Sequence, residues 1–309
     1  MSYSFKLARF QLRIIFLTRR FILWLKGCDT EERQSKRQEE VSVKTAFLVD
    51  YFARKYMPSV NRLTQKQITV ENPETIWQFW DNPVGQTTPD IVNASIRTVE
   101  KFKGNFKHKV LNNSTIGDYS DLPGYVFDRL KNGKMIYAHF ADLLRLNLLK
   151  NHGGVWMDAT LYMTDFIPKY IIDSDFFVFL TGNLTHYSYS FMQNFFIRAK
   201  KGSFLCEAWE QMGVEYWKKE YRAIDYFQHQ IMFKTLVFKH PPAQKLFAEM
   251  PYVNEDEVLQ FVDSLFTTFD ANEWDRIKKI SFLQKTTYKI PDIDIYQDTY
   301  FSKLSEGKL

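Results

Sequence analysis

Residues 138–160 read AHFADLLRLNLLKNHGGVWMDAT, in which a helix pattern, a turn and a strand pattern follow one another directly. Leucine and alanine recur on nearly every side of the segment that runs from Lys134 to His152, which is typical of a buried helix. The pair Gly153-Gly154 predicts a tight reversal at the end of this helix. A short buried strand, Val155-Trp156-Met157, then leads straight to Asp158.

Three polar residues of this buried helix share one side of it. His139, Asp142 and Arg145 fall within about 120° of arc, given about 100° per residue. An unpaired buried charge is costly, so these groups are paired with one another or face a cavity. An internal Asp142–Arg145 ion pair and a ligand site are therefore both open at this point.

Strand and helix patterns alternate from residue 75 to about residue 240, which predicts an α/β sheet with helices on its faces. We expect strands at 75–80, 106–111, 155–157, 176–180 and 191–197, and helices at 43–56, 91–102, 134–152, 204–221 and 226–238. Ligands of such sheets bind beyond the carboxyl ends of the strands. Asp158 stands at such an end, so a ligand-facing carboxylate is favoured there over a turn cap.

The N-terminal segment predicts a basic amphipathic helix over residues 5–25. Charged residues interrupt its apolar runs, which excludes a spanning helix and a signal peptide. An apolar arc comprises Leu7, Ile14, Ile15, Phe21, Ile22 and Leu25, and a basic arc opposite comprises Lys6, Arg9, Arg13 and Arg20. This pattern favours contact with an anionic membrane surface, the alternatives being docking on the protein itself or a partner coiled coil.

The composition excludes several classes of protein. The chain has 309 residues, 45% hydrophobic and 25% charged, so a disordered protein is not expected. A net charge of +5 is mild and the charges of residues 72–240 are mixed, so we expect no nucleic-acid partner. The P-loop motif GxxxxGK[ST] does not occur, and no strand is followed by the dinucleotide-binding motif GxGxxG, so both of these nucleotide-binding classes are excluded. Cys28 and Cys206 lie far apart, which argues against a disulfide framework or a zinc site and fits a reducing cytoplasm.

The central block resembles the signature of capsular polysaccharide synthesis glycosyltransferases, relatives of glycosyltransferase family 32, the Asp-X-Asp sugar-binding group. The resemblance rests on residues 138–145, Leu148-Leu149 and residues 153–160. Weaker matches extend it to about residues 72–240, namely Ile76 to Trp80 with Pro89 and Ser95, Gln193-Asn194, and Asp225 to Phe227. It implies a GT-A fold, in which a Rossmann-like sheet binds a nucleotide sugar, and transfer with retention at the anomeric carbon.

The same resemblance implies roles for individual residues. Asp158 and Thr160 take the Asp-X-Asp positions and would hold Mn²⁺ or Mg²⁺, although Thr160 replaces the second carboxylate. Asp142 and Arg145 take the positions that contact the donor sugar. Oxygen ligands, diphosphate and water suit such a hard cation, so the chemistry and the resemblance agree.

Other side chains are weaker candidates. Trp77 or Trp80 would stack on the base of the donor, or else pack in the core. Gln193 and Asn194 would bind sugar hydroxyls or the acceptor, or else lie on a polar surface. The lone histidines, expected to be structural rather than catalytic, are His139, His186 and His229.

We therefore expect residues 1–60 to form a helical, membrane-associating region and residues 61–309 a GT-A catalytic domain. The expected activity is transfer of a sugar, most simply from a UDP-sugar, to a lipid-linked saccharide acceptor in capsular or other surface polysaccharide synthesis. The expected place is cytoplasmic, peripheral at the inner face of the cell membrane. The alternative is a non-catalytic, membrane-associated sugar-nucleotide-binding or scaffold protein, which the replacement by Thr160 would support.

Overall fold

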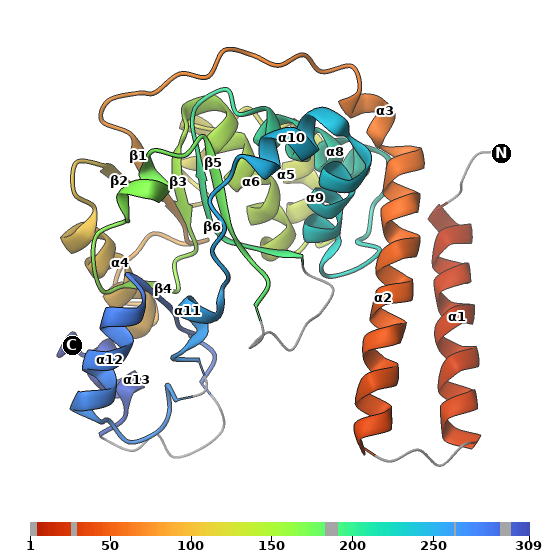
Figure 1. The fold of residues 1–309 in the computed structure, drawn as a ribbon. Coiled ribbons are helices and arrows are strands. Elements are labelled where there is room, and N and C mark those ends of the chain that lie inside the picture. Colours follow the sequence, from red (N-terminus) through yellow and green to blue (C-terminus); the bar gives the residue numbers. More distant parts are fainter. Residues whose placement is uncertain (1–4, 26–29, 183–190, 263, 291–297) are drawn as a thin grey trace.

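Five strands form the central sheet of the computed structural model, in the order β2-β1-β3-β6-β5 (Figure 1). They are β1 (Thr75–Phe79), β2 (Lys107–Leu111), β3 (Gly154–Met157), β5 (Phe176–Leu180) and β6 (Met192–Ala199). β1 is parallel to both β2 and β3, whereas β6 is antiparallel to both β3 and β5. The predicted α/β sheet is confirmed as a mixed sheet, while its assignment to the GT-A type stays a prediction.

The structure describes residues 5–25, 30–182, 191–262, 264–290 and 298–309, and of these it leaves out the side chains of 15–16, 18–25 and 30–38. The longer helices are α1 (Phe5–Leu25), α2 (Thr30–Lys55), α4 (Asp90–Phe102), α5 (Gly124–Lys131), α6 (Tyr137–His152), α8 (Phe204–Lys219), α9 (Gln228–Lys239), α10 (Pro241–Ala248) and α12 (Ala271–Ile280). The short elements are α3 (Met57–Val60), α7 (Lys169–Ile172), α11 (Asp256–Leu259), α13 (Tyr300–Ser305), a 3₁₀ turn (Ile116–Asp118), β4 (Leu161–Met163) and β7 (Leu283–Lys285).

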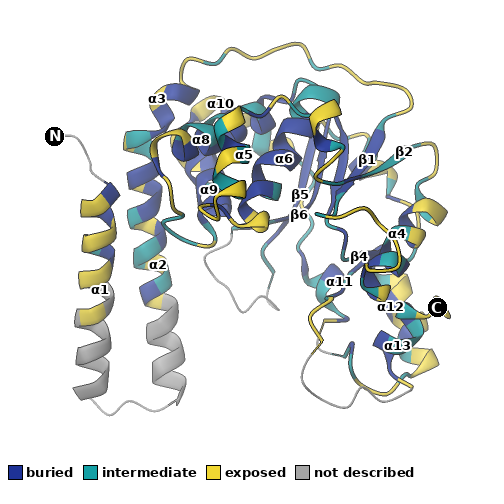
Figure 2. Cartoon of the chain, turned by 180° about the vertical axis from the view of Figure 1, so that it is seen from behind, coloured by how far each residue is buried: buried dark blue, intermediate teal, exposed yellow. Residues whose placement is uncertain are grey.

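Alternate residues of the strands pack on opposite faces of the sheet, because successive side chains of a strand point to opposite sides. Trp156 and Ile197 join a cluster with α6, α8 and α9 on one face. Their neighbours Val155 and Phe196 join α4 and β4 on the other face. Figure 2 shows buried residues concentrated in the sheet and in the helices next to it. Burial on both faces explains why the strands read as nearly continuous apolar runs.

The reversal between α6 and β3 requires both of its glycines. Gly153 and Gly154 have φ of +70° and +101°. A Cβ on Gly154 would lie 2.0 Å from the carbonyl oxygen of Thr75, and one on Gly153 would lie 2.6 Å from the backbone nitrogen of Lys201. Only glycine tolerates such a conformation in such close contact, so this pair fixes where β3 begins and where Asp158 is placed.

A second, two-stranded sheet pairs β4 with β7, and Leu161 stands opposite Lys285. The backbone N–H and the hydroxyl of Thr286 both donate to the carbonyl oxygen of Thr160, at 3.0 and 2.8 Å. A segment from the C-terminal part of the chain is thereby held against the residues that follow β3. Neither β4 nor β7 is among the strands expected from the sequence.

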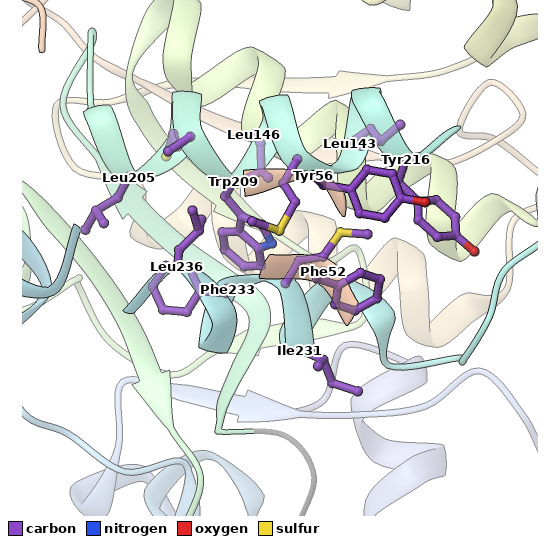
Figure 3. Packing of buried hydrophobic residues seen from close by; sticks show 14 of the residues in the cluster. Phe52, Tyr56, Leu143, Leu146, Leu205, Trp209, Tyr216, Ile231, Phe233 and Leu236 are labelled. Atoms are coloured by element: carbon purple, nitrogen blue, oxygen red, sulfur yellow. The ribbon is translucent and has the colours of Figure 1, made fainter. Parts of the chain in front are cut away.

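The N-terminal helices α1 and α2 lie side by side at one end of the molecule, and α2 packs on α9 (Figure 1). Aromatic residues at the end of α2 and directly after it enter the main core, where Figure 3 shows Phe52 and Tyr56 near Tyr216. α2 begins at Thr30, well before the expected helix 43–56. The charged residues 30–41 are thus helical, since Glu, Gln, Lys and Arg are good helix formers.

The described part of α1 divides its apolar residues between two sides. Phe5, Ala8 and Leu12 are buried, whereas the side chains exposed to solvent are Leu7, Phe10, Ile14 and Leu17. Leu7 and Ile14 belong to the predicted apolar arc, and the other members of that arc lie outside the described side chains. Among the described helices, none has both the length and the apolar character needed to span a bilayer.

Candidate functional site

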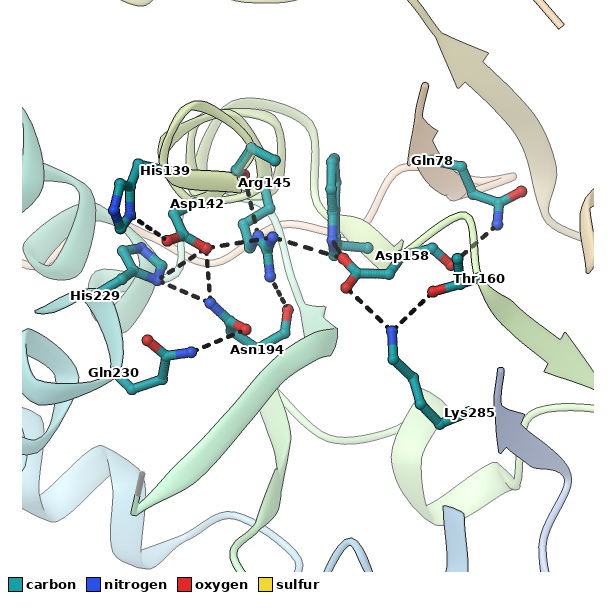
Figure 4. A network of polar contacts seen from close by, with 12 residues as sticks. Gln78, His139, Asp142, Arg145, Asp158, Thr160, Asn194, His229, Gln230 and Lys285 are labelled. Carbon is teal, nitrogen blue, oxygen red and sulfur yellow. Dashed lines mark hydrogen bonds and ion pairs between the residues drawn. The ribbon is translucent and has the colours of Figure 1, made fainter. Parts of the chain in front are cut away.

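A network of polar side chains lies at the edge of the sheet where β1, β2 and β3 end (Figure 4). Strand β6 runs in the opposite direction, so its beginning lies at the same edge. The labelled members are Gln78, His139, Asp142, Arg145, Asp158, Thr160, Asn194, His229, Gln230 and Lys285. They come from β1, α6, the turn after β3, β6, α9 and β7, so segments distant in the sequence converge on one place.

Asp158 is held by its backbone and its side chain. Its N–H donates to the carbonyl oxygen of Phe195 at 2.8 Å, and its own carbonyl oxygen accepts from Leu161 at 2.9 Å. The indole N–H of Trp156 donates to Oδ1 at 3.0 Å. The carboxylate therefore leaves β3 in a defined direction, as the sequence predicted for a residue at a strand end.

Arg145 connects the two aspartates of the network. Its Nη2 lies 3.3 Å from Oδ1 of Asp142 and 3.6 Å from Oδ1 of Asp158. Its other nitrogens donate to the carbonyl oxygens of Ala141 and Asn194, and its guanidinium lies over the ring of Trp156. The Asp142–Arg145 pair, one of the two alternatives for this helix, is thus present, and Arg145 extends it to Asp158.

Asp142 lies among the amide of Asn194, two imidazole rings and the guanidinium of Arg145. Asn194 donates to its Oδ1 at 2.8 Å, and Nδ1 atoms of His139 and His229 lie 3.6 and 3.7 Å from its carboxylate oxygens. Burial raises the pKa of Asp142, but His229, Arg145 and His139 together outweigh burial and bring it to about 2. Burial lowers the pKa of His229 to about 3, although Asp142 opposes this. At neutral pH, Asp142 is therefore ionised and His229 is neutral.

Lys285 joins the network from β7. Its Nζ donates to the hydroxyl of Thr160 at 2.8 Å and lies 3.6 Å from Oδ2 of Asp158 (Figure 4). It also lies 5.6 Å from the centre of the Phe195 ring. Burial lowers the pKa of Lys285, and Arg145 adds to this effect while Asp158 opposes it. Two aspartates and two basic residues therefore alternate along the network.

The network opens to solvent at the Asp158 end. The side chains of Asp158 and Lys285 are 30% and 26% exposed, whereas those of Asp142 and Arg145 are only 11% and 5% exposed. At the closed end, Nε2 of His229 and Oε1 of Gln230 are buried with no hydrogen-bond partner among the described residues. A ligand can reach Asp158 and Lys285 directly, and the inner groups position these two.

The donor set matches a divalent cation poorly. The predicted ligands Asp158 and Thr160 supply one carboxylate and one hydroxyl, and Lys285 contacts both. Within the described ranges, no group of three or more His, Cys, Asp or Glu side chains is arranged to hold a metal ion. A divalent ion between these oxygens would face two positive side chains, Lys285 and Arg145, and like charges repel. The Mn²⁺ or Mg²⁺ site stays a prediction.

The other predicted site residues divide into two groups. Asn194 belongs to the network, whereas the side chain of its neighbour Gln193 hydrogen-bonds Glu255 instead. Burial raises the pKa of this Glu255 to about 7, with the bonds from Gly182 and Gln193 opposing it. Neighbouring residues of a strand point to opposite faces of the sheet, which explains why Gln193 and Asn194 have different partners.

The two tryptophans also differ. Trp77 is only 2% exposed, and its indole N–H donates to the carbonyl oxygen of Gly153. Core packing, one of the two alternatives for Trp77, is what the structure shows, since a buried ring offers no face to a base. Trp80 is half-buried. It contacts the exposed ring of Tyr288 edge to face, with 5.3 Å between the ring centres. Base stacking therefore stays a prediction for Trp80 alone.

Several members of the network were not expected from the sequence. Lys285 lies in a short strand with no motif, and only its pairing with the residues after β3 brings it to the site. His139 and His229 were expected to be structural; both flank Asp142, from α6 and α9. His186 lies outside the described residues.

Comparisons with known proteins identify the family to which the chain is similar. A family model described as "Capsular polysaccharide synthesis protein" matches residues 21–304. The chain is 24% identical over 196 residues to the O-glycosyltransferase braB of Annulohypoxylon truncatum, a match that covers 59% of this chain but only 46% of that protein. The solved structure of the PaToxG glycosyltransferase resembles this chain with a TM-score of 0.39 and 13% identity, over 81% of this chain and 100% of that one.

Proposed function

The chain belongs to the capsular polysaccharide synthesis protein family, and from this membership we propose that it is a glycosyltransferase. It would move a sugar from a nucleotide-sugar donor to a saccharide acceptor in capsular or other surface polysaccharide synthesis. The observation that carries the proposal is the Asp158 network, a carboxylate at a strand end flanked by two basic side chains at 3.6 Å each. The similarity to an O-glycosyltransferase supports the same reaction class.

The proposed reaction explains the charges of the network. When the bond between the sugar and the diphosphate breaks, its electron pair stays on the diphosphate, so fixed positive charge is needed beside that group. Lys285 is the basic side chain at the open end, and Arg145 lies behind it with its nitrogens engaged by the protein. Asp158 contacts both, one at each carboxylate oxygen, and thereby orients them.

Binding of the nucleotide has a candidate surface beside the network. Trp80 comes two residues after Gln78 and Tyr288 three residues after Lys285, so this aromatic pair is close in the sequence to two members of the network. An exposed aromatic edge suits the flat face of a base. Uracil as the base and retention at the anomeric carbon are further parts of the proposal that come from the resemblance. The resemblance also implies Mn²⁺ or Mg²⁺, and whether the donor requires such an ion is a separate question, because Lys285 and Arg145 already contact Asp158.

We also propose that the protein works at the inner face of the cell membrane on a lipid-linked acceptor. The exposed apolar side chains of α1 support this, because Lys6, Arg9 and Arg13 are exposed on the same helix. Apolar insertion together with basic side chains is the usual means by which such helices bind anionic bilayers.

The test is a panel of UDP- and GDP-sugars offered to the full chain. Thermal unfolding shows which donor binds, since a ligand specific to the folded state raises the melting temperature by mass action. Release of the nucleoside diphosphate shows turnover, and the anomeric configuration of the product shows retention or inversion. A donor that binds without any turnover would favour the non-catalytic alternative, and no binding by any donor would contradict both.

A further inference from the structure

Lys285 occupies the space between the two residues that the resemblance assigns to a metal ion. We propose that the ammonium group of Lys285 takes the part of that divalent cation and binds the diphosphate of the nucleotide-sugar donor. This inference rests on the proposed function and specifies how its donor is bound. It makes Lys285 a binding residue and predicts that donor binding needs no added metal.

The first argument is positional. One ammonium group contacts both Thr160 Oγ1, at 2.8 Å, and Asp158 Oδ2, at 3.6 Å. These are the oxygen atoms that a cation at an Asp-X-Asp site would share. An ammonium group has three N–H donors, and within the described residues only these two oxygens are recorded as its polar partners. A donor is thus left for a phosphate oxygen, on a side chain that is 26% exposed.

The second argument is charge balance. An Asp-X-Asp motif offers two carboxylates to a divalent ion, whereas Asp158 and Thr160 offer one. A single negative charge matches a single ammonium, and Arg145 already lies on the other oxygen of Asp158. One carboxylate and one ammonium group at this place therefore balance each other in charge, as two carboxylates and a divalent ion would. Lysine is a common point-charge partner of phosphate.

The third argument is rigidity. Lys285 ends β7, and Leu161 of β4 is its partner in the pairing of the two strands. The next residue, Thr286, binds the carbonyl oxygen of Thr160 twice, through its N–H and through its hydroxyl. The backbone of Lys285 is thus attached directly to the turn that carries Asp158 and Thr160. Such a fixed charge is typical of a binding group rather than of a surface lysine, which samples many rotamers.

The experiment measures binding of UDP and GDP by calorimetry, with UMP and GMP as the matching monophosphates, to the metal-free full chain in EDTA and again with Mn²⁺. For the diphosphate that binds, we expect similar affinity in both buffers. Lys285→Met should weaken its binding by about 10- to 100-fold, the range for loss of one hydrogen bond to a charged group. Binding of the monophosphate should weaken much less, and Lys285→Arg should retain part of the affinity.

The matched control is Lys289→Met, which removes an exposed lysine four positions along the same segment. If the role of Lys285 were purely structural, Lys285→Met would lower the melting temperature and would weaken diphosphate and monophosphate binding to the same extent. That result would overturn the inference. Binding by the wild-type chain only in Mn²⁺, or equal diphosphate affinity of Lys285→Met and wild type, would overturn the inference while leaving the proposed function intact. If the folded wild type bound no nucleotide in either buffer, the proposed function would fail, and the inference with it.

Discussion

At the scale of single residues, Asp158 is the group on which the proposed site depends. It meets Arg145 and Lys285 at opposite oxygens, so Asp158→Asn should leave both cations in place but poorly oriented. We expect turnover to fall by about 10²-fold, the scale seen when one preorganised electrostatic group is lost. The fold should persist, because amide and carboxylate have nearly the same shape. Asp275→Asn, on the exposed surface of α12, is the matched control, and a near-normal rate for Asp158→Asn would contradict the site.

Asp142 should behave differently because the protein surrounds it. Its partners are Asn194, Arg145 and the two histidines, and its side chain is 11% exposed. Asp142→Asn leaves the buried guanidinium of Arg145 with one carboxylate instead of two, so we expect a loss of about 3–5 kcal/mol in the free energy of unfolding. Denaturant unfolding measures this loss. An unchanged unfolding midpoint with lost activity would instead favour the donor-sugar contact that the resemblance implies.

His229 gives the network a dependence on pH. Burial lowers its pKa from 6.5 to about 3 in the folded protein. Below pH 6.5, His229 therefore binds a proton in the unfolded chain but not in the folded chain. Stability must therefore fall as the pH falls, by up to about 1.4 kcal/mol per pH unit between the two pKa values. We expect a loss of about 2 kcal/mol attributable to His229 between pH 6.5 and about pH 5. His229→Gln should flatten this slope, and equal slopes for variant and wild type would contradict the assignment.

At the scale of elements, the sequence was most informative where apolar runs are bounded by clear stop signals. The strands near Trp77, Trp156 and Phe177 and the helix that ends at Gly153 were predicted to within a few residues, because burial on two faces and glycine turns leave strong patterns. The early start of α2 was missed because a helix surface and a solvated linker have the same composition. β4 and β7 were missed because a three-residue strand has no periodicity, and only tertiary pairing defines it.

The helix α1 illustrates how a face can be predicted only in part. One side of α1 packs against the protein and another side is exposed to solvent, since Leu12 is buried while Leu17 is 67% exposed. Replacing the exposed residues Leu7, Phe10, Ile14 and Leu17 by Ser should abolish flotation with anionic vesicles and leave the melting temperature nearly unchanged. The control replaces exposed rings elsewhere, Phe166→Ser and Tyr252→Ser. If the four-residue variant floats as wild type does, the membrane proposal is wrong.

At the scale of the whole molecule, the candidate site could be predicted as far as one continuous stretch of chain reaches. Asp142, Arg145 and Asp158 lie in the 138–160 block, and their convergence followed from a helix, a turn and a strand in series. Lys285 and His229 come from segments whose approach depends on sheet order and on the packing of α9. Local sequence patterns do not depend on such long-range contacts, so Lys285 and His229 could not have been assigned to the site from one sequence.

The boundary predicted between a helical region at 1–60 and a catalytic domain at 61–309 leads to a last test. Phe52 of α2 and Tyr56, which directly follows α2, are fully buried, and the centres of their rings lie 6.1 and 5.4 Å from that of Tyr216 in α8. Tyr56 and Lys55 also bind the buried carboxylate of Glu220. A chain of residues 61–309 would lose about 1.5–3 kcal/mol for each buried ring and leave Glu220 unpaired.

We therefore expect the 61–309 chain to show no cooperative thermal transition, because typical domains have only about 5–15 kcal/mol of stability to lose. A chain of residues 30–309 lacks only α1 and its few buried contacts, so it should fold cooperatively with a modestly lower melting temperature. It should also keep the hydrolysis of the nucleotide sugar while losing vesicle binding, since α1 lies at one end of the molecule, beyond α2 and away from β3, the strand that leads to Asp158 (Figure 1). If the 61–309 chain unfolds cooperatively near the temperature of the full chain, α2 is an appendage and the catalytic domain begins where the sequence predicted. If it does not, the aromatic contacts of α2 are part of the catalytic core itself, and only α1 is free to serve the membrane.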